Sequence, residues 1–106
     1  MRFRYQQELV LQLPASSIKD YDTLIELENC IRIGLSNLGD VDGHDMGQGE
    51  MNIFIHTDNP KLTFERIKLL LGTRDFYPEM KVAYRDIGKK DFTVVYPPSL
   101  THFTIA

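Results

Sequence analysis

The stretch from Gly39 to Thr57, GDVDGHDMGQGEMNIFIHT, decides the fold of this chain. In its second half the apolar residues Met51, Ile53 and Ile55 alternate with residues that are mostly polar. A period of two is typical of a strand with one buried face and one wetter face. The first half alternates weakly, and Gly47-Gln48-Gly49 lies between the halves. The stretch therefore predicts a β-hairpin.

The length of the hairpin loop determines which side chains share a face. A three-residue loop needs a left-handed residue at its last position, which Gly49 can supply without steric cost. His44 then faces Asn52, whereas a two- or four-residue loop changes the register by one and moves His44 to the apolar side. We predict the three-residue loop because it keeps the polar groups together and away from the core. The shared face would carry Asp42, His44, Glu50, Asn52 and His56.

These five residues are the candidate ligand or metal site. Carboxylate and imidazole donors suit zinc, manganese or iron, although the spacing matches no established metal signature. The alternative is a glycine-rich turn held by hydrogen bonds from its aspartate and histidine side chains. The glycines precede a strand, so they do not form a phosphate loop, and no GxSxG nucleophile motif is present. We assign no catalytic residue and no cofactor, and the sequence favours a non-catalytic protein.

Composition indicates one globular domain over residues 1–106, with 42% hydrophobic and 25% charged residues. The net charge is −3 and there is no basic block, which argues against nucleic-acid binding as the main role. Cys30 is the only cysteine, so an internal disulfide is excluded. The first residues lack the apolar core of a signal peptide, and no apolar run is long enough to span a membrane. We therefore expect a cytoplasmic protein with no membrane partner.

Before the hairpin, residues 4–13 predict a strand that ends at Pro14, since proline cannot donate to the ladder. A helix should begin between Ser17 and Asp22 and run to about Asn37, with Gly34 or Gly39 as its stop. Its buried stripe, at helical spacing, is Leu24, Leu27, Ile31, Leu35 and Leu38. Glu28 falls close to this stripe, and we interpret it as an edge carboxylate that reaches water.

After the hairpin, Asn59 predicts an N-cap and Pro60 the first turn of a helix that ends at Gly72. Residues 73–79 predict a loop, and residues 80–86 and 92–96 predict a second hairpin. This order resembles the ferredoxin-like, or split βαβ, plan, an antiparallel sheet with two helices on one face. We thus predict an α+β fold of that type with an extra C-terminal strand.

That plan leaves one sheet face bare, and here the bare face would carry Val10 and Phe54. The patch is large for a monomer, so something should cover it. The candidates are a second subunit and the chain's own tail, through residues such as Phe103. We predict a homodimer with Val10, Phe54 and Phe103 at the interface.

Three function classes follow from these features. The first is a non-catalytic interaction or regulatory module that acts through the open sheet face, on itself or on another protein. The second is a small-ligand or metal-binding protein that uses the hairpin over residues 42–56. The third is an immunity-type protein inhibitor with an acidic surface, for which small size and negative charge are the support.

Overall fold

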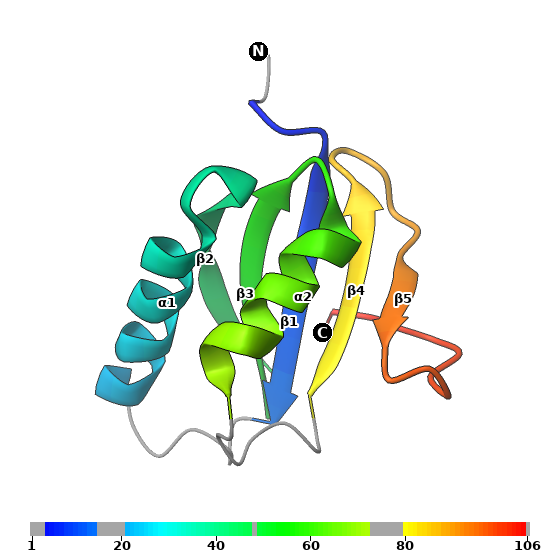
Figure 1. Ribbon diagram of the computed structural model, residues 1–106. Helices are drawn as coiled ribbons and strands as arrows, with labels where there is room; N and C mark the ends of the chain where they lie inside the picture. The colour runs from blue at the N-terminus through cyan, green and yellow to red at the C-terminus, as the bar shows by residue number, and fades with distance from the viewer. Residues whose placement is uncertain (1–3, 15–20, 48, 73–79, 106) are drawn as a thin grey trace.

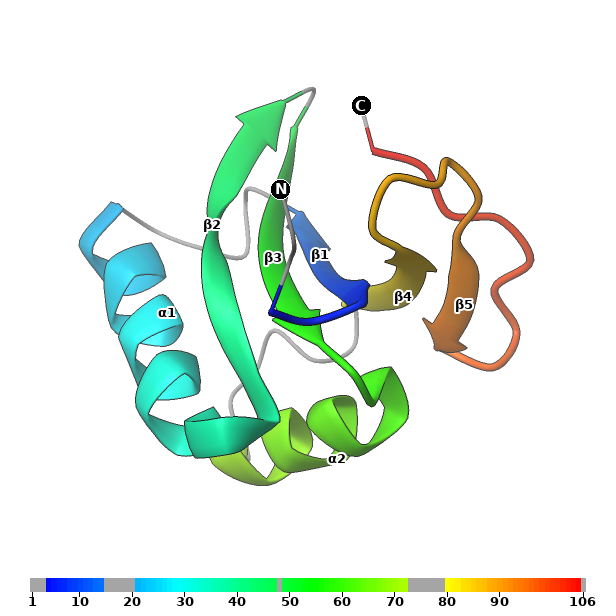
Figure 2. The ribbon, with the colours of Figure 1, turned by 90° about the horizontal axis from the view of Figure 1, so that it is seen from above.

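The structure is a computed structural model that describes residues 4–14, 21–47, 49–72 and 80–105 (Figure 1). The elements, in chain order, are β1 (Gln7–Pro14), α1 (Tyr21–Leu35), the 3₁₀ turn η2 (Ser36–Leu38), β2 (Gly39–Gly47), β3 (Glu50–Thr57), α2 (Pro60–Leu71), β4 (Lys81–Asp86) and β5 (Thr93–Tyr96). The strands form one antiparallel sheet in the order β2-β3-β1-β4-β5, and both helices cover the same face (Figures 1 and 2). The predicted α+β class is confirmed.

Each helix joins two parallel strands that have another strand between them. β1 and β2 are both antiparallel to β3, and β3 and β4 are both antiparallel to β1. The connection through α1 therefore passes over β3, and the connection through α2 passes over β1. β1 becomes the central strand, so its side chains are buried on both faces of the sheet.

The main core lies between the sheet and the helices, as predicted from the alternating apolar residues of the strands and the helical apolar stripe of α1. Leu9, Leu11 and Leu13 of β1 are at most 1% exposed and face the helices. The predicted stripe of α1 packs against them: Leu24, Leu27, Ile31 and Leu35 are buried, and Leu38 is half-buried. Glu28 was wrongly interpreted as an edge carboxylate, because its residue is only 4% exposed.

The ends of the two helices differ in how well the sequence predicted them. Asn59 caps α2 by accepting a 3.2 Å hydrogen bond from Leu62 N–H, and Pro60 and Gly72 begin and end that helix as expected. Of the range from Ser17 to Asp22 in which α1 was expected to begin, residues 17–20 lie outside the described residues, and Asp22 lies in the first turn of α1. Gly34 does not end α1: it lies within the helix, where a Cβ would collide with the Leu70 side chain of α2. The glycine permits the two helices to approach closely.

The predicted hairpin is present, but its predicted register was wrong. Gly47 pairs with Glu50, which leaves two residues in the loop, and His44 pairs with Ile53 instead of Asn52. A β-bulge between Val41 and Gly43 then shifts the register back by one residue toward the start of β2. Gly49 does adopt a positive φ of 80°, as predicted.

The change of register separates the two hairpin histidines. Because Ile53 belongs to the main core, its neighbour His44 lies on the helix side of the sheet. His56 pairs with Glu8 of β1 and lies on the opposite side, which we call the far face. The prediction that His44 shares a face with the other four residues is therefore wrong, since a shift of one residue reverses the side on which a side chain lies. Glu50, Asn52 and His56 do alternate on one side of β3, where Asp42 contacts His56.

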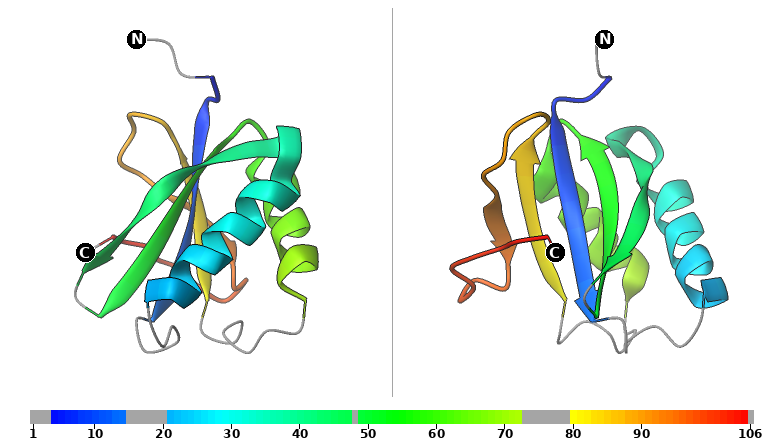
Figure 3. Two further views of the ribbon diagram at one scale, coloured as in Figure 1. Left: turned by 90° about the vertical axis from the view of Figure 1, so that its left-hand side faces the viewer. Right: turned by 180° about the vertical axis from the view of Figure 1, so that it is seen from behind.

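The second hairpin matches its prediction closely. β4 and β5 pair through Tyr84 with Thr93 and Ala83 with Val94. Lys89 N–H donates a 3.0 Å hydrogen bond to Asp86 C=O in the connecting turn, where Gly88 has a φ of 92°. After β5 the chain turns back across the far face of the sheet, as the rear view in Figure 3 shows.

Candidate functional site

The C-terminal tail covers the centre of the far face. Phe103 is 9% exposed and packs with Val10 and Ala83, which are fully buried beneath it. Its ring meets that of Phe92 edge-on, at 5.0 Å between centroids and 60° between planes. The sequence suggested that either a second subunit or the tail covers this face. In the structure the tail covers its centre, and Val10 and Phe103 pack against each other within one molecule.

A ladder of polar side chains joins the tail to the hairpin. Gln12 Nε2 donates to Asn52 Oδ1 at 3.0 Å and to the backbone oxygen of Thr104 at 2.9 Å. Asn52 Nδ2 in turn donates to Asp45 Oδ1 at 2.9 Å. Gln12 and Asn52 are 3% and 1% exposed, so these bonds satisfy groups that would be costly to bury alone. The ladder holds the tail in one position over the sheet.

A row of charged side chains crosses the far face near its other end. Glu8 Oε1 accepts a 3.1 Å hydrogen bond from Arg85 Nε and lies 2.9 Å from Arg85 Nη2. Glu8 Oε2 lies 3.5 Å from His56 Nε2, which is also 3.7 Å from Asp42 Oδ2. The row therefore runs from Asp42 on β2 through β3 and β1 to Arg85 on β4.

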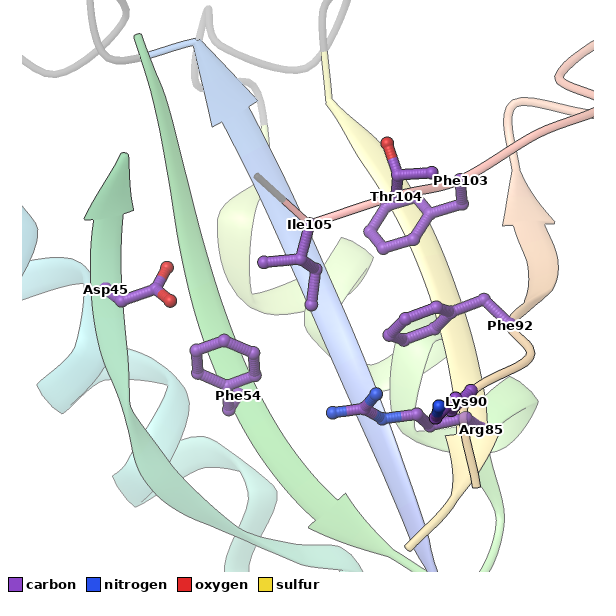
Figure 4. Close-up of a pocket in the computed structure, with 8 residues that line it drawn as sticks. All are labelled: Asp45, Phe54, Arg85, Lys90, Phe92, Phe103, Thr104 and Ile105. Atoms are coloured by element: carbon purple, nitrogen blue, oxygen red, sulfur yellow. The ribbon is translucent and has the colours of Figure 1, made fainter. Parts of the chain in front are cut away.

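A pocket of about 420 Å³ lies between the tail, the second hairpin and the sheet (Figure 4). Its lining comprises Asp45, Phe54, Arg85, Lys90, Phe92, Phe103, Thr104 and Ile105. Figure 4 shows Phe54 on the side of Asp45, and Phe92 and Phe103 on the other side together with Arg85 and Lys90. Arg85 also lies over Phe92, with Cζ 4.7 Å from the ring centroid. The pocket thus offers apolar ring surfaces beside two positive charges.

His44 belongs to a separate cluster on the helix side. Its Nδ1 lies 2.5 Å from Glu28 Oε1, and the two side chains are 23% and 6% exposed. Among the described residues, Glu28 Oε1 has no hydrogen-bond partner of good geometry, although His44 Nδ1 approaches it closely. The pair holds β2 to α1 and faces away from the pocket.

The structure brings together a donor set that the sequence did not predict. Glu8, Asp42 and His56 each place one ligand atom within 4.8 Å of the other two. Of the predicted set, Asp42 and His56 belong to this group, Asn52 belongs to the polar ladder, and His44 lies on the other face. Glu50 is half-buried beside the turn, opposite Gly47. Glu8 was overlooked, although its alternation with Val10 and Gln12 placed it on the far face.

No described helix is long and apolar enough to cross a membrane. No protein-family model matches the chain, and neither a curated protein nor a solved structure is significantly similar to it. Inferences about function therefore rest on the geometry of the far face.

Proposed function

We propose that this protein is a non-catalytic binding module that takes a small ligand, with a flat apolar body and a negatively charged group, into the far-face pocket. The observation that supports the proposal is the lining of that pocket. Phe54, Phe92 and Phe103 offer ring surfaces, and Arg85 and Lys90 stand beside them. Ligand sites are typically concave, mostly apolar and provided with a few polar groups that orient the ligand.

The two cations would contribute differently. Arg85 is half-buried and already held by Glu8, so it would act as a pre-oriented donor that needs little reorganisation. Lys90 is exposed on the second hairpin and can move to meet an anionic group. Asp45 at the opposite end would repel a second negative charge. The pocket therefore favours a molecule with its charge at one end only.

The dye 8-anilinonaphthalene-1-sulfonate has this chemistry and is a suitable probe. Titration should give saturable fluorescence enhancement with the wild type, and Phe54→Ala and Lys90→Gln should each weaken binding several-fold. Lys89→Gln is the matched control, because Lys89 is exposed on the same turn and does not line the pocket. Equal binding by the wild type and both pocket variants would contradict the proposal.

Self-association is a second candidate, favoured by the half-buried ring of Phe54. A second copy would have to meet Phe54 and the outer side of the tail, since Val10 is already covered. Light scattering at micromolar concentration tests this: a dimeric mass that Phe54→Asp reduces to a monomer supports it, and a monomeric wild type contradicts it. An immunity-type inhibitor would instead use the exposed acids Asp40, Asp42 and Asp45 of β2, and that class stays a prediction. So does a cytoplasmic location.

We also infer that β1, α1, β2, β3, α2 and β4 follow the ferredoxin-like plan. The support is their order and the two crossovers, each of which spans an inserted antiparallel strand. β5 and the tail would then be additions to that plan. The connection from β4 to β5, through Lys90 and Phe92, and the tail supply one wall of the pocket, so the proposed binding site depends on the part of the chain that extends the basic fold.

A further inference from the structure

We propose that Glu8, Asp42 and His56 bind one Zn²⁺ ion on the far face, as a site separate from the pocket. The three side chains come from three different strands and converge because β1, β3 and β2 are neighbours in the sheet. They supply one imidazole nitrogen and two carboxylate oxygens. A mixed set of this kind suits zinc, whereas magnesium and calcium prefer all-oxygen sites with more ligands.

The two separations that involve His56 match those of ligands around an ion, and all three donor atoms lie within 4.8 Å of one another. His56 Nε2 is 3.5 Å from Glu8 Oε2 and 3.7 Å from Asp42 Oδ2. Direct charge-assisted hydrogen bonds are shorter, about 2.7–2.9 Å. Ligands about 2.1 Å from a tetrahedral zinc ion stand roughly 3.4 Å from one another. The observed spacing is therefore too long for good direct hydrogen bonds and close to that of a coordination shell.

The two oxygens of Glu8 have different neighbours, which prepares one of them for a metal. Oε1 is engaged by Arg85 through Nε and Nη2, and Oε2 is directed toward His56. Hydrogen bonds from outside the shell commonly orient metal ligands and tune the charge on them. Arg85 would play this part, and it would also limit the net negative charge before the ion binds.

The β-bulge of β2 explains why Asp42 takes part. Asp40 pairs with His56 and Val41 with Ile55, but the next paired residue is Gly43, opposite Phe54. Asp42 is the extra residue, and its carboxylate reaches His56 from this irregular position. Bulges often re-aim a side chain next to a functional site. Gly43, with a φ of 151°, permits the backbone conformation that follows.

The site would be open on one side. The Asp42 side chain is 58% exposed, whereas those of His56 and Glu8 are 19% and 14% exposed. A water molecule can therefore complete a tetrahedral shell with the three protein ligands. Zinc sites with three protein ligands and one water are the open type, distinct from closed structural sites.

Isothermal titration of the full chain with Zn²⁺, after treatment with a chelator and its removal, tests the proposal. We expect one equivalent to bind the wild type, with at least tenfold weaker binding by His56→Ala and by Asp42→Asn. Asp42→Asn should not disturb folding, because Asp42 is exposed and asparagine has nearly the same shape. Binding of Co²⁺ should give visible absorption bands of a four-coordinate ion, which both variants should lose.

Two controls separate this site from others on the chain. His102→Ala removes an exposed histidine outside the donor set and should leave Zn²⁺ affinity unchanged, as should the pocket variant Lys90→Gln. If the wild type binds Zn²⁺ but does not bind the dye, only the pocket proposal fails. The zinc proposal is overturned if the wild type takes up no Zn²⁺ at millimolar concentration, or if His102→Ala weakens binding as much as His56→Ala.

Discussion

The two faces of the sheet bury their side chains by different means. The helix face is covered by α1 and α2 and contains an apolar core of large, fully buried residues, with the His44–Glu28 contact between β2 and α1 beside it. The far face has a small apolar centre around Val10, Ala83 and Phe103, with the charged row on one side and the polar ladder on the other. Its cover is a tail of irregular backbone (Figure 3).

Because the two faces are covered differently, we expect the helix face to supply most of the stability and the far face to supply the binding sites. Helices that carry regular apolar stripes bury a continuous core, which supplies most of the folding free energy. The tail is held by the small apolar cluster around Phe103 and by the hydrogen bond from Gln12, so it buries less apolar surface than the helices do. A pocket lies at its edge. Binding sites tend to lie where local stability is low enough to allow access. The far face therefore combines the pocket and the open donor set, while the helix face holds the domain together.

The largest expected effect is a core truncation on the helix face. Leu11→Ala removes a side chain that is 1% exposed on the central strand, and it should lower the free energy of unfolding by about 3 kcal/mol. Phe103→Ala on the far face should cost roughly half as much, because the tail can detach without global unfolding. Urea denaturation measures both values. A larger loss from Phe103→Ala would mean that the tail belongs to the cooperative core.

The two hairpin histidines give the next contrast. His44→Ala removes the imidazole that contacts the buried Glu28 carboxyl group and should cost about 2 kcal/mol. His56→Ala should cost less than about 1 kcal/mol, since Glu8 retains Arg85 and Asp42 is exposed. Both should be measured in a chelator, so that metal binding does not contribute. Equal losses would contradict the assignment of the histidines to different environments.

A double variant sharpens the same comparison. Replacing both partners, as His44→Leu with Glu28→Leu, removes the buried carboxyl group together with its neighbour and should recover most of the stability lost in His44→Ala. If the double variant is no more stable than His44→Ala, the contact between β2 and α1 depends on the shape of the two side chains more than on their charge.

The last prediction concerns the turn that sets the register for both faces. Gly49 has a φ of 80° and open space around its Cβ position, so Gly49→Ala should cost about 1 kcal/mol through backbone strain alone. Gly49→Asn is the matched control and should cost less, because asparagine tolerates left-handed conformations. Thermal denaturation of the two variants decides the point. Equal stability of Gly49→Ala and the wild type would contradict the strain argument.

The sequence by itself determined the element order, the fold class and most of the helix-side core. Those features depend on local signals: the leucine alternation of β1, the helical stripe that begins at Leu24, and the cap and first turn formed by Asn59 and Pro60. Each signal lies within one element, so no distant part of the chain is needed to interpret it.

Only the tertiary structure decided the register of the first hairpin, the burial of Glu28 and the position of the tail. One loop residue and one bulge reverse the side on which a strand side chain lies, and the sequence does not distinguish a GQG loop of three residues from one of two. The donor set joins Glu8 to residues more than thirty positions away, and Gln12 bonds to Thr104. Such contacts exist only after β1 has entered the sheet between β3 and β4, because strand order, not distance along the chain, makes these side chains neighbours.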